Sequence, residues 1–348
     1  MAERLQATAP AVAVDQRTDG PGVTHIDRSD PAAPMYQLLA KIRAPLTLRD
    51  TMITPVRVGY AGQTPPEGAA DAVPRWDHLF PNVVVTEINI PSPDGPIRCQ
   101  VYQPSPRPAG RPLLLYVHGG GFMVGRSEDT DYMTRRICAD NGTIVVSVNY
   151  RLAPEWPFPA GLDDCVAVYA WLRAHGGEVG GDPARVGVAG DSAGGNFAVA
   201  LPLRARARAM PPPDAVVAFA PVLDLRFEEH ESFNRLAPLG VVYDAAFMGF
   251  LRGAYCRHSE WDHPDVSPLR GELRGYPPAL IAVGTHDPLV DSCTAFARKA
   301  RETGSDVELL VYEGMPHGFY FWPGLFREES EAYAALTGFL RRHLGTAA

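Results

Sequence analysis

The chain has 348 residues, of which 46% are hydrophobic and 21% charged, and its formal net charge is −8 at pH 7. This composition is typical of a globular protein with one large α/β domain or two domains, and it excludes disorder throughout. The acidic balance argues against nucleic-acid binding, because such binding needs clustered basic side chains. We therefore expect a small-molecule partner and no nucleic acid.

We expect no targeting or membrane-spanning segment in this sequence. The longest apolar runs, 113–117 and 215–223, are far shorter than the ~20 residues that span a bilayer. The N-terminal MAERLQATAPAVAVDQ lacks the charged-then-apolar pattern of a signal peptide. Five cysteines are dispersed without CxxC spacing, which predicts reduced, mostly buried thiols and no zinc site. We expect a cytoplasmic location and no membrane association.

The N-terminal part of the chain is irregular up to about residue 80. Residues 1–33 are polar and aperiodic, which predicts a loose arm, and helical spacing in 35–45 predicts a short helix. The segments 83–90 and 97–104 then alternate apolar and polar residues around the turn-forming PSPDGP. This pattern predicts an antiparallel β-hairpin.

From residue 112 onward, short apolar runs alternate with amphipathic stretches, which predicts a mostly parallel central sheet with helices on both faces. The predicted strands are 113–118, 143–150, 185–190, 215–223, 279–287 and 307–314, and the predicted helices are 130–141, 162–174, 192–207, 291–303 and 328–344. Residues 224–275 interrupt this alternation and predict a helical insertion over the sheet edge. The aromatic residues of this insertion are Phe227, Phe233, Tyr243, Phe247, Phe250, Tyr255 and Trp261.

The stretch VGVAGDSAGGNFAVA (186–200) places a serine between a predicted strand and a predicted helix. Gly190, Ser192 and Gly194 match the G-x-S-x-G nucleophile elbow, in which small residues let strand and helix backbones approach. The helix N-terminus behind the serine offers a backbone N–H to developing negative charge. The alternative to a nucleophile is that the five residues match this pattern by chance and that Ser192 only caps the helix.

A serine nucleophile needs a base, and the base needs an orienting carboxylate. With a nucleophile elbow, the carboxylate and the histidine follow the serine in that order. His317, in the loop GMPHGF after the last predicted strand, is the predicted base. His286 leaves little chain for an acid before it, and His343 is expected on the surface of the last helix. The remaining histidines after Ser192, which fall in the insertion, are His230, His258 and His263.

The predicted carboxylate is Asp287, directly after the strand ALIAVG in THDPLVD. Asp291 is an alternative, although its expected place is near the N-terminus of the following helix. Asp224, at the end of another predicted strand, is a weaker alternative.

The glycine-rich HGGGF (118–122) directly follows the predicted strand LLLYV. Consecutive glycines let backbone N–H groups turn closely toward a ligand. Together with the N–H after the serine, such groups form an oxyanion hole in folds with a nucleophile elbow. A flexible turn and a phosphate loop are the alternatives, but the spacing misses G-x-G-x-x-G by one residue and no G-K-[ST] follows.

Five motifs occur in the order found in the hormone-sensitive-lipase-like esterases, also called bacterial family IV: HGGGF, YRLAPEWPFPA (150–160), GDSAGG, DPLVD and HGF. The chain resembles this family over about residues 80–345. The resemblance implies an α/β-hydrolase with Ser192 as nucleophile, His317 as base and Asp287 as its partner. The implied oxyanion donors are the backbones of Gly120, Gly121 and Ala193, with Gly119 as a further candidate. Structural roles are implied for His118, which would hold the glycine loop, and for Glu155 and Asp191, which would brace loops near the site.

The resemblance also implies a division of the chain. Residues 1–80 would form an N-terminal arm and cap segment, and 224–275 a helical cap insertion. The α/β-hydrolase core would then comprise 81–223 and 276–348. The aromatic residues of the insertion would line the acyl pocket or pack the cap against the sheet.

These features predict a serine carboxylesterase for short- to medium-chain esters that needs no metal or cofactor. Family members often dimerise through the sheet edge, so a homodimer is a further expectation. An amidase, lactonase or carbamate hydrolase with the same triad is the main alternative. Acyl transfer to an alcohol and a non-catalytic receptor are weaker alternatives, and the presence of His317 argues against the receptor.

Overall fold

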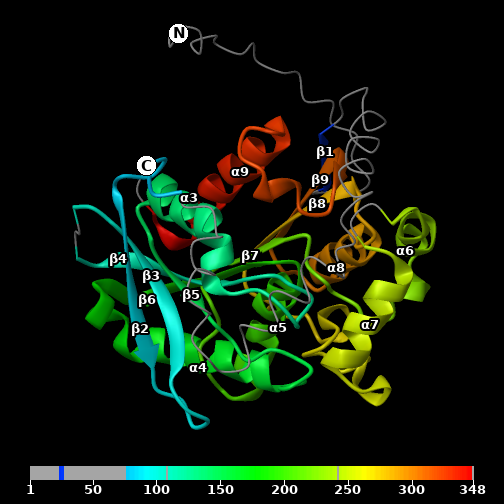
Figure 1. The fold of residues 1–348 in the computed structure, drawn as a ribbon, viewed down its shortest axis with the longest axis horizontal. Coiled ribbons are helices and arrows are strands. Elements are labelled where there is room, and N and C mark those ends of the chain that lie inside the picture. The colour runs from blue at the N-terminus through cyan, green and yellow to red at the C-terminus, as the bar shows by residue number, and fades with distance from the viewer. Residues whose placement is uncertain (1–22, 27–75, 107–108, 241–242, 347–348) are drawn as a thin grey trace, which may run out of the picture.

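The computed structural model describes residues 23–26, 76–106, 109–240 and 243–346. Its described part is built on one nine-stranded sheet with the order β1-β9-β8-β7-β6-β4-β5-β3-β2 (Figure 1). The predicted arm (1–33) and the predicted helix (35–45) lie outside the described residues, except for the four residues of β1. The predicted division at residue 80 therefore stays a prediction.

The sheet is parallel except at one end, where β3 pairs in antiparallel fashion with both β2 and β5. The strands are β1 (Val23–Ile26), β2 (Val83–Ile90), β3 (Ile97–Pro104), β4 (Arg111–Val117), β5 (Ile144–Val148), β6 (Gly181–Asp191), β7 (Val216–Phe219), β8 (Ala279–His286) and β9 (Val307–Pro316). The inner strands are apolar and buried on both sides, as parallel strands covered by helices must be.

Helices cover both faces of the sheet, as predicted (Figure 1). They are α3 (Asp131–Asn141), α4 (Ala160–His175), α5 (Ser192–Ala207), α6 (Glu231–Leu236), α7 (Ala245–Tyr255), α8 (Val290–Glu302) and α9 (Arg327–Leu344). One face carries α3 packed against α9, and the other carries α4 packed against α5. None of the helices in the described part of the chain is long and apolar enough to cross a membrane.

Most predicted elements are confirmed, and one strand is corrected. The hairpin strands have the predicted bounds, and the five predicted core helices begin and end within two residues of expectation. The strand predicted over 215–223 ends at Phe219, because Ala220 has a φ of 42° and Pro221 has no N–H for a sheet ladder. All five cysteines are unpaired and buried, as predicted.

The segment 224–275 contains α6, α7 and short 3-10 turns between β7 and β8, and so is helical as predicted. Asn196 of α5 ties it to the core, since its side-chain amide donates hydrogen bonds to the carbonyl oxygens of Val222 (2.6 Å) and Val266 (2.8 Å). The chain just before the insertion and a loop in its second half are thereby held beside the first turns of the helix that follows the elbow.

Candidate active site

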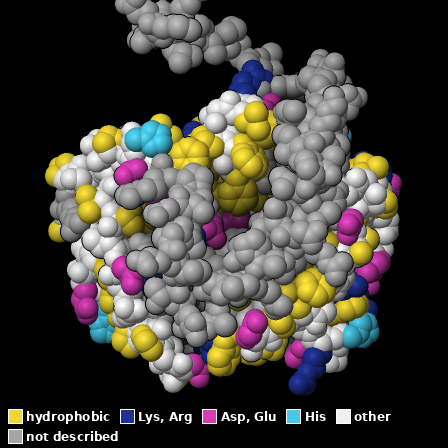
Figure 2. Space-filling view, in the orientation of Figure 1, with side chains coloured by type: hydrophobic (Ala, Val, Ile, Leu, Met, Phe, Trp, Pro, Cys, Tyr) yellow, Lys and Arg dark blue, Asp and Glu magenta, His cyan; other side chains and the backbone are white. Residues whose placement is uncertain are grey.

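The candidate site lies at the carboxyl ends of adjacent parallel strands. Ser192 follows β6, Asp287 follows β8 and His317 follows β9, while the glycine loop 118–122 follows β4. Because β4 and β6 are neighbours and so are β8 and β9, the sheet order alone brings these four segments to one edge. Figure 2 shows a hollow near the middle of one face of the molecule, with hydrophobic side chains along one wall and acidic ones at its base.

The elbow has the close backbone approach that its glycines predict. Ser192 has a φ of 53°, in the left-handed region that a side chain disfavours. A Cβ at Gly194 would lie 2.1 Å from the carbonyl oxygen of Val117, and a Cβ at Gly190 would lie 2.4 Å from that of Gly194. Strand, turn and helix are thus packed so closely that the Ser192 side chain must project from the turn.

His317 and Asp287 form a buried pair. The Nδ1 of His317 lies 2.7 Å from Oδ2 of Asp287, and the side chains are 2% and 0% exposed. The Oδ1 of Asp287 accepts the backbone N–H of Leu289 (2.9 Å), which fixes the rotation of the carboxylate. A Cβ at Gly284 would lie 1.9 Å from the carbonyl oxygen of Met315, so glycine lets β8 and β9 approach here. With Nδ1–H donated to Asp287, the other ring nitrogen is left as a proton acceptor.

The acceptor nitrogen of His317, Nε2, is buried and has no hydrogen-bond partner among the described residues. Tyr243 lies beside both residues: the Ser192 side chain acts on the pKa of its hydroxyl as a hydrogen-bond partner, and its ring centroid lies 4.8 Å from that of His317. Catalytic hydrogen bonds are commonly long without substrate and shorten in the Michaelis complex.

The glycine loop leaves backbone N–H groups for an oxyanion. Gly120 has a φ of 119° and Gly121 a φ of 60°, and the carbonyl oxygen of Gly120 accepts the N–H of Val124 (3.0 Å). The N–H groups of Gly120 and Gly121 have no acceptor among the residues that the structure describes. Ala193 lies in the first turn of α5, where N–H groups have no intrahelical acceptor.

Gly119 differs from the other predicted donors. Its N–H donates to Oδ1 of Asp191 (3.1 Å), so this group already has an acceptor. A Cβ on Gly119 would lie 2.2 Å from Oδ2 of Asp191. The structure therefore favours Gly120, Gly121 and Ala193 over Gly119 as oxyanion donors.

His118 has the predicted structural role. Its Nδ1 lies 2.7 Å from the carbonyl oxygen of Gly119, and its ring stacks on Tyr150 at 4.3 Å. The Tyr150 hydroxyl donates to the carbonyl oxygen of His118 (2.9 Å). Burial lowers the pKa of His118 to about 4, partly opposed by the contact with Gly119. His118 is therefore neutral at pH 7 and holds the loop.

Replacing Gly120 tests the oxyanion loop. A Cβ there would lie 2.0 Å from the carbonyl oxygen of Val124, so Gly120→Ala must displace the loop. We expect ester hydrolysis to fall by about 10²- to 10³-fold, the effect of losing one oxyanion donor. The matched control is Gly95→Ala, because Gly95 has a nearly identical φ of 117° but nothing within 4 Å of an added Cβ. The account is contradicted if kcat falls equally in both variants.

Asp191 is a buried carboxylate beneath the loop. Its Oδ1 also accepts the Tyr116 hydroxyl (2.8 Å). Burial raises its pKa to about 6, although the hydrogen bonds from Tyr116 and Gly119 and the charge of His317 act in the opposite direction. The folded protein thus holds this proton more tightly than the unfolded chain, in which an aspartate pKa is about 4.

This pKa gives a signed prediction for stability. The stabilising contribution of Asp191 is fully present below about pH 4 and is lost as the pH rises through about 6, a change on the order of 3 kcal/mol. We expect the unfolding free energy of the wild type minus that of Asp191→Asn to fall as the pH rises through this window. Urea unfolding at pH 4.5 to 7.5 measures it. A flat difference, or one that increases with pH, would show that the carboxyl is not held protonated.

The alternative acids make other contacts. The Oδ2 of Asp291 accepts the backbone N–H of Ser232 (2.7 Å). Asp224 lies 3.1 Å from Nε2 of His230 and also accepts from Arg270. Neither carboxylate contacts His317, so Asp287 is the one carboxylate hydrogen-bonded to this histidine within the described ranges.

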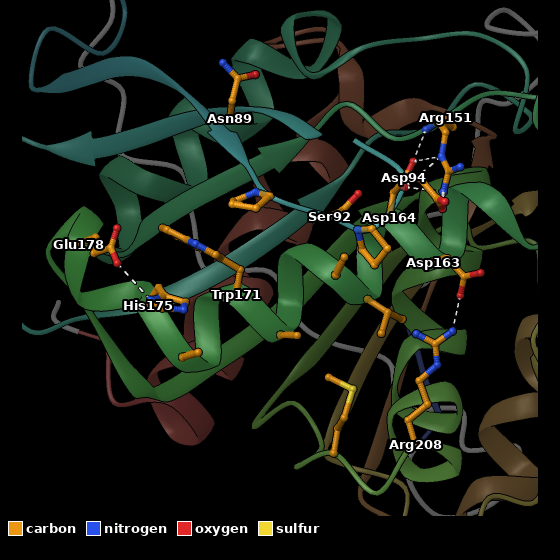
Figure 3. A pocket seen from close by; sticks show the side chains of 17 residues that line it. Asn89, Ser92, Asp94, Arg151, Asp163, Asp164, Trp171, His175, Glu178 and Arg208 are labelled. Atoms are coloured by element: carbon orange, nitrogen blue, oxygen red, sulfur yellow. Dashed lines mark hydrogen bonds and ion pairs between the residues drawn. The ribbon is translucent and has the colours of Figure 1, made fainter. Parts of the chain in front are cut away.

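A separate groove of about 950 Å³ lies between the β2–β3 turn and α4 (Figure 3). One of its cations, Arg151, is paired with Asp164 (2.8 Å) and with Asp94 (3.0 Å). Arg208 is likewise paired with Asp163 (2.5 Å). No triad residue lines this groove, and we assign it no catalytic role.

Sequence reasoning missed two contacts of the insertion with the site. Leu251 of α7 covers the glycine loop, since its Cδ1 would lie 2.5 Å from a Cβ on Gly121. Tyr243 contacts both Ser192 and His317. Both residues belong to the aromatic and apolar side chains of the insertion that the sequence shows. A single sequence does not indicate which of these side chains reach the site.

A parallel sheet with a strained serine at a strand–helix junction, followed by a buried Asp–His pair, defines an α/β-hydrolase. A family model described as "alpha/beta hydrolase fold" matches residues 114–321. Esterase LipI of Mycobacterium tuberculosis is 36% identical over 259 residues, which cover 73% of this chain and 80% of LipI.

Solved structures of esterases share this fold. An esterase from the hyperthermophilic archaeon Pyrobaculum calidifontis has a TM-score of 0.77 at 28% identity, with 90% of this chain and 99% of that one covered. A hormone-sensitive lipase from a metagenome library has a TM-score of 0.75 at 26% identity, with 91% and 100% covered. The chain belongs to the α/β-hydrolase fold family and, within it, to the hormone-sensitive-lipase-like carboxylic ester hydrolases, as the sequence predicts.

Proposed function

We propose that the chain is a serine carboxylesterase that hydrolyses short- to medium-chain esters through Ser192, His317 and Asp287. The observation that carries this proposal is the buried Asp287–His317 pair (2.7 Å) beside a serine held at a φ of 53°. A base oriented by a carboxylate next to a nucleophile at an elbow is the arrangement that acyl transfer requires.

Acylation follows from this arrangement. The Nε2 of His317 takes the proton of Ser192 as Oγ attacks the ester carbonyl carbon, and Asp287 stabilises the imidazolium that forms. The oxyanion accepts hydrogen bonds from the N–H groups of Gly120, Gly121 and Ala193. His317 then gives its proton to the departing alcohol oxygen.

Deacylation repeats these steps with water. His317 removes a proton from the water as its oxygen attacks the acyl carbon. The tetrahedral intermediate collapses, the bond from carbon to Oγ of Ser192 breaks, and Oγ takes the proton back from His317. The carboxylic acid leaves and the resting site is restored.

The insertion supports the preference for shorter acyl chains. Tyr255 of α7 stacks on Phe122 of the glycine loop with ring centroids 3.8 Å apart, and Leu251 reaches Gly121. These contacts close the space over the loop. We propose that 224–275 acts as a cap on the core segments 81–223 and 276–348, with 1–80 as its second part. Dimerisation and the cytoplasmic location stay predictions.

Hydrolysis of p-nitrophenyl esters from C2 to C16 tests the chain-length proposal. We expect kcat/KM to peak at C8 or shorter, because side chains of α7 close the space over the glycine loop. A peak at C12 or longer would contradict this expectation. Matched p-nitroanilides show whether amides are cleaved faster than esters, which would favour the amidase alternative. Added alcohol shows whether an ester replaces the carboxylic acid as product, which would favour acyl transfer.

A further inference from the structure

Tyr243 is a residue of the insertion that touches the reacting atoms. Its hydroxyl lies within reach of the side chain of Ser192, which acts on its pKa as a hydrogen-bond partner. Its ring lies across that of His317, with centroids 4.8 Å apart and planes at 68°. A single side chain therefore contacts both the proposed nucleophile and the proposed base.

The residues that follow Tyr243 are anchored. Asp244, the next residue, caps α7, because its Oδ1 accepts the backbone N–H of Phe247 (2.7 Å). The ring of Phe247 also stacks on Tyr243, with centroids 5.8 Å apart and planes at 7°. The start of α7 thus positions Tyr243 from two directions, as a group acting on the triad would need.

The Tyr243 hydroxyl keeps its proton at neutral pH. Burial and the charge of Asp287 raise its pKa, while the hydrogen bond with Ser192 acts in the opposite direction. A neutral phenol beside Oγ can donate a hydrogen bond to that oxygen. Its ring adds an edge-to-face contact that favours one orientation of the imidazole.

We propose that Tyr243 is a further catalytic residue, whose hydroxyl donates a hydrogen bond to Oγ of Ser192 when Oγ leaves the acyl-enzyme. In that step the bond from the acyl carbon to Oγ breaks and Oγ takes its proton from Nε2 of His317. Tyr243 keeps its own proton throughout and stabilises the charge that Oγ gains. This role rests on the proposed acyl-enzyme mechanism.

Removing the hydroxyl alone tests the proposal. For Tyr243→Phe we expect kcat for p-nitrophenyl butyrate to fall by about 10- to 100-fold, the effect of losing a hydrogen bond to a group that gains charge. The p-nitrophenol burst keeps its amplitude because the acyl-enzyme still forms. Tyr243→Leu, which also removes the ring, is expected to slow the burst as well.

The matched control is Tyr312→Phe. Tyr312 of β9 is buried, and its ring packs against that of Phe319 with centroids 5.1 Å apart. We expect the kcat of Tyr312→Phe to equal that of the wild type. Thermal unfolding of all variants reports loss of fold separately from loss of rate.

Three results would overturn the proposal: an unchanged kcat in Tyr243→Phe, a raised kcat, or a change in KM alone, which would indicate simple pocket lining. The proposed function itself fails differently, because then Ser192→Ala would also retain activity. An inactive Ser192→Ala beside a fully active Tyr243→Phe overturns only the role of Tyr243.

Discussion

Ser192→Ala and His317→Ala are each expected to lower the hydrolysis of short p-nitrophenyl esters by at least about 10³-fold. Without Oγ there is no nucleophile, and without the imidazole nothing takes its proton. Because the two residues act as one unit, the double variant should be no slower than either single one. Initial rates with p-nitrophenyl acetate and butyrate measure all three.

A second Asp–His pair provides the control. The Nε2 of His230, in the insertion, lies 3.1 Å from Oδ2 of Asp224, and no hydrogen bond joins His230 to Ser192 or His317 among the described residues. His230→Ala should therefore keep its rate within a few-fold. If it loses as much activity as His317→Ala while both remain folded, the base is wrongly assigned.

Asp287→Asn is expected to lower kcat by about 10⁴-fold while the fold persists. The N–H of Leu289 donates to Oδ1 (2.9 Å), so the amide oxygen of asparagine takes that position and its NH₂ group faces Nδ1 of His317. The imidazole must then carry its proton on Nε2, where it can no longer accept the proton of Ser192. Steady-state kinetics across pH 6 to 9 measure the loss.

Asp291→Asn is the matched control for this substitution. The carboxylate of Asp291 accepts a hydrogen bond from the backbone N–H of Ser232 (2.7 Å), and an asparagine oxygen can do the same. We expect near wild-type kinetics. If activity survives in Asp287→Asn and disappears in Asp291→Asn, the carboxylate of the triad is Asp291 and not Asp287.

The sequence predicts the core of this molecule well because its signals are local. Strand-length apolar runs separated by amphipathic helices determine the parallel sheet, and PSPDGP marks the hairpin turn. Ser192, Asp287 and His317 are the predicted triad because each lies at the end of a predicted strand or in the loop that follows it. Chain order then selects Asp287 and His317 from several carboxylates and histidines.

What the sequence could not predict depends on long-range packing. The hydrogen bond from the Gly119 N–H to Asp191 joins residues 72 positions apart, and sequence periodicity gives no signal for such a contact. The contact of Tyr243 with Ser192 and His317 depends on how the insertion folds back over the strand ends. The early end of β7 has one cause that the sequence does not indicate, the backbone turn at Ala220, and one that it does, the missing N–H of Pro221.

The central claim is that Ser192 forms a covalent acyl-enzyme, and trapping that bond tests it most directly. We would treat the protein with a short-chain alkyl p-nitrophenyl phosphonate and measure the intact mass, the residual activity and the modified peptide. The account predicts one adduct per chain, on Ser192, in proportion to the lost activity, and no adduct in Ser192→Ala. Inactivation with the adduct on another residue, or full activity with Ser192 modified, would contradict it.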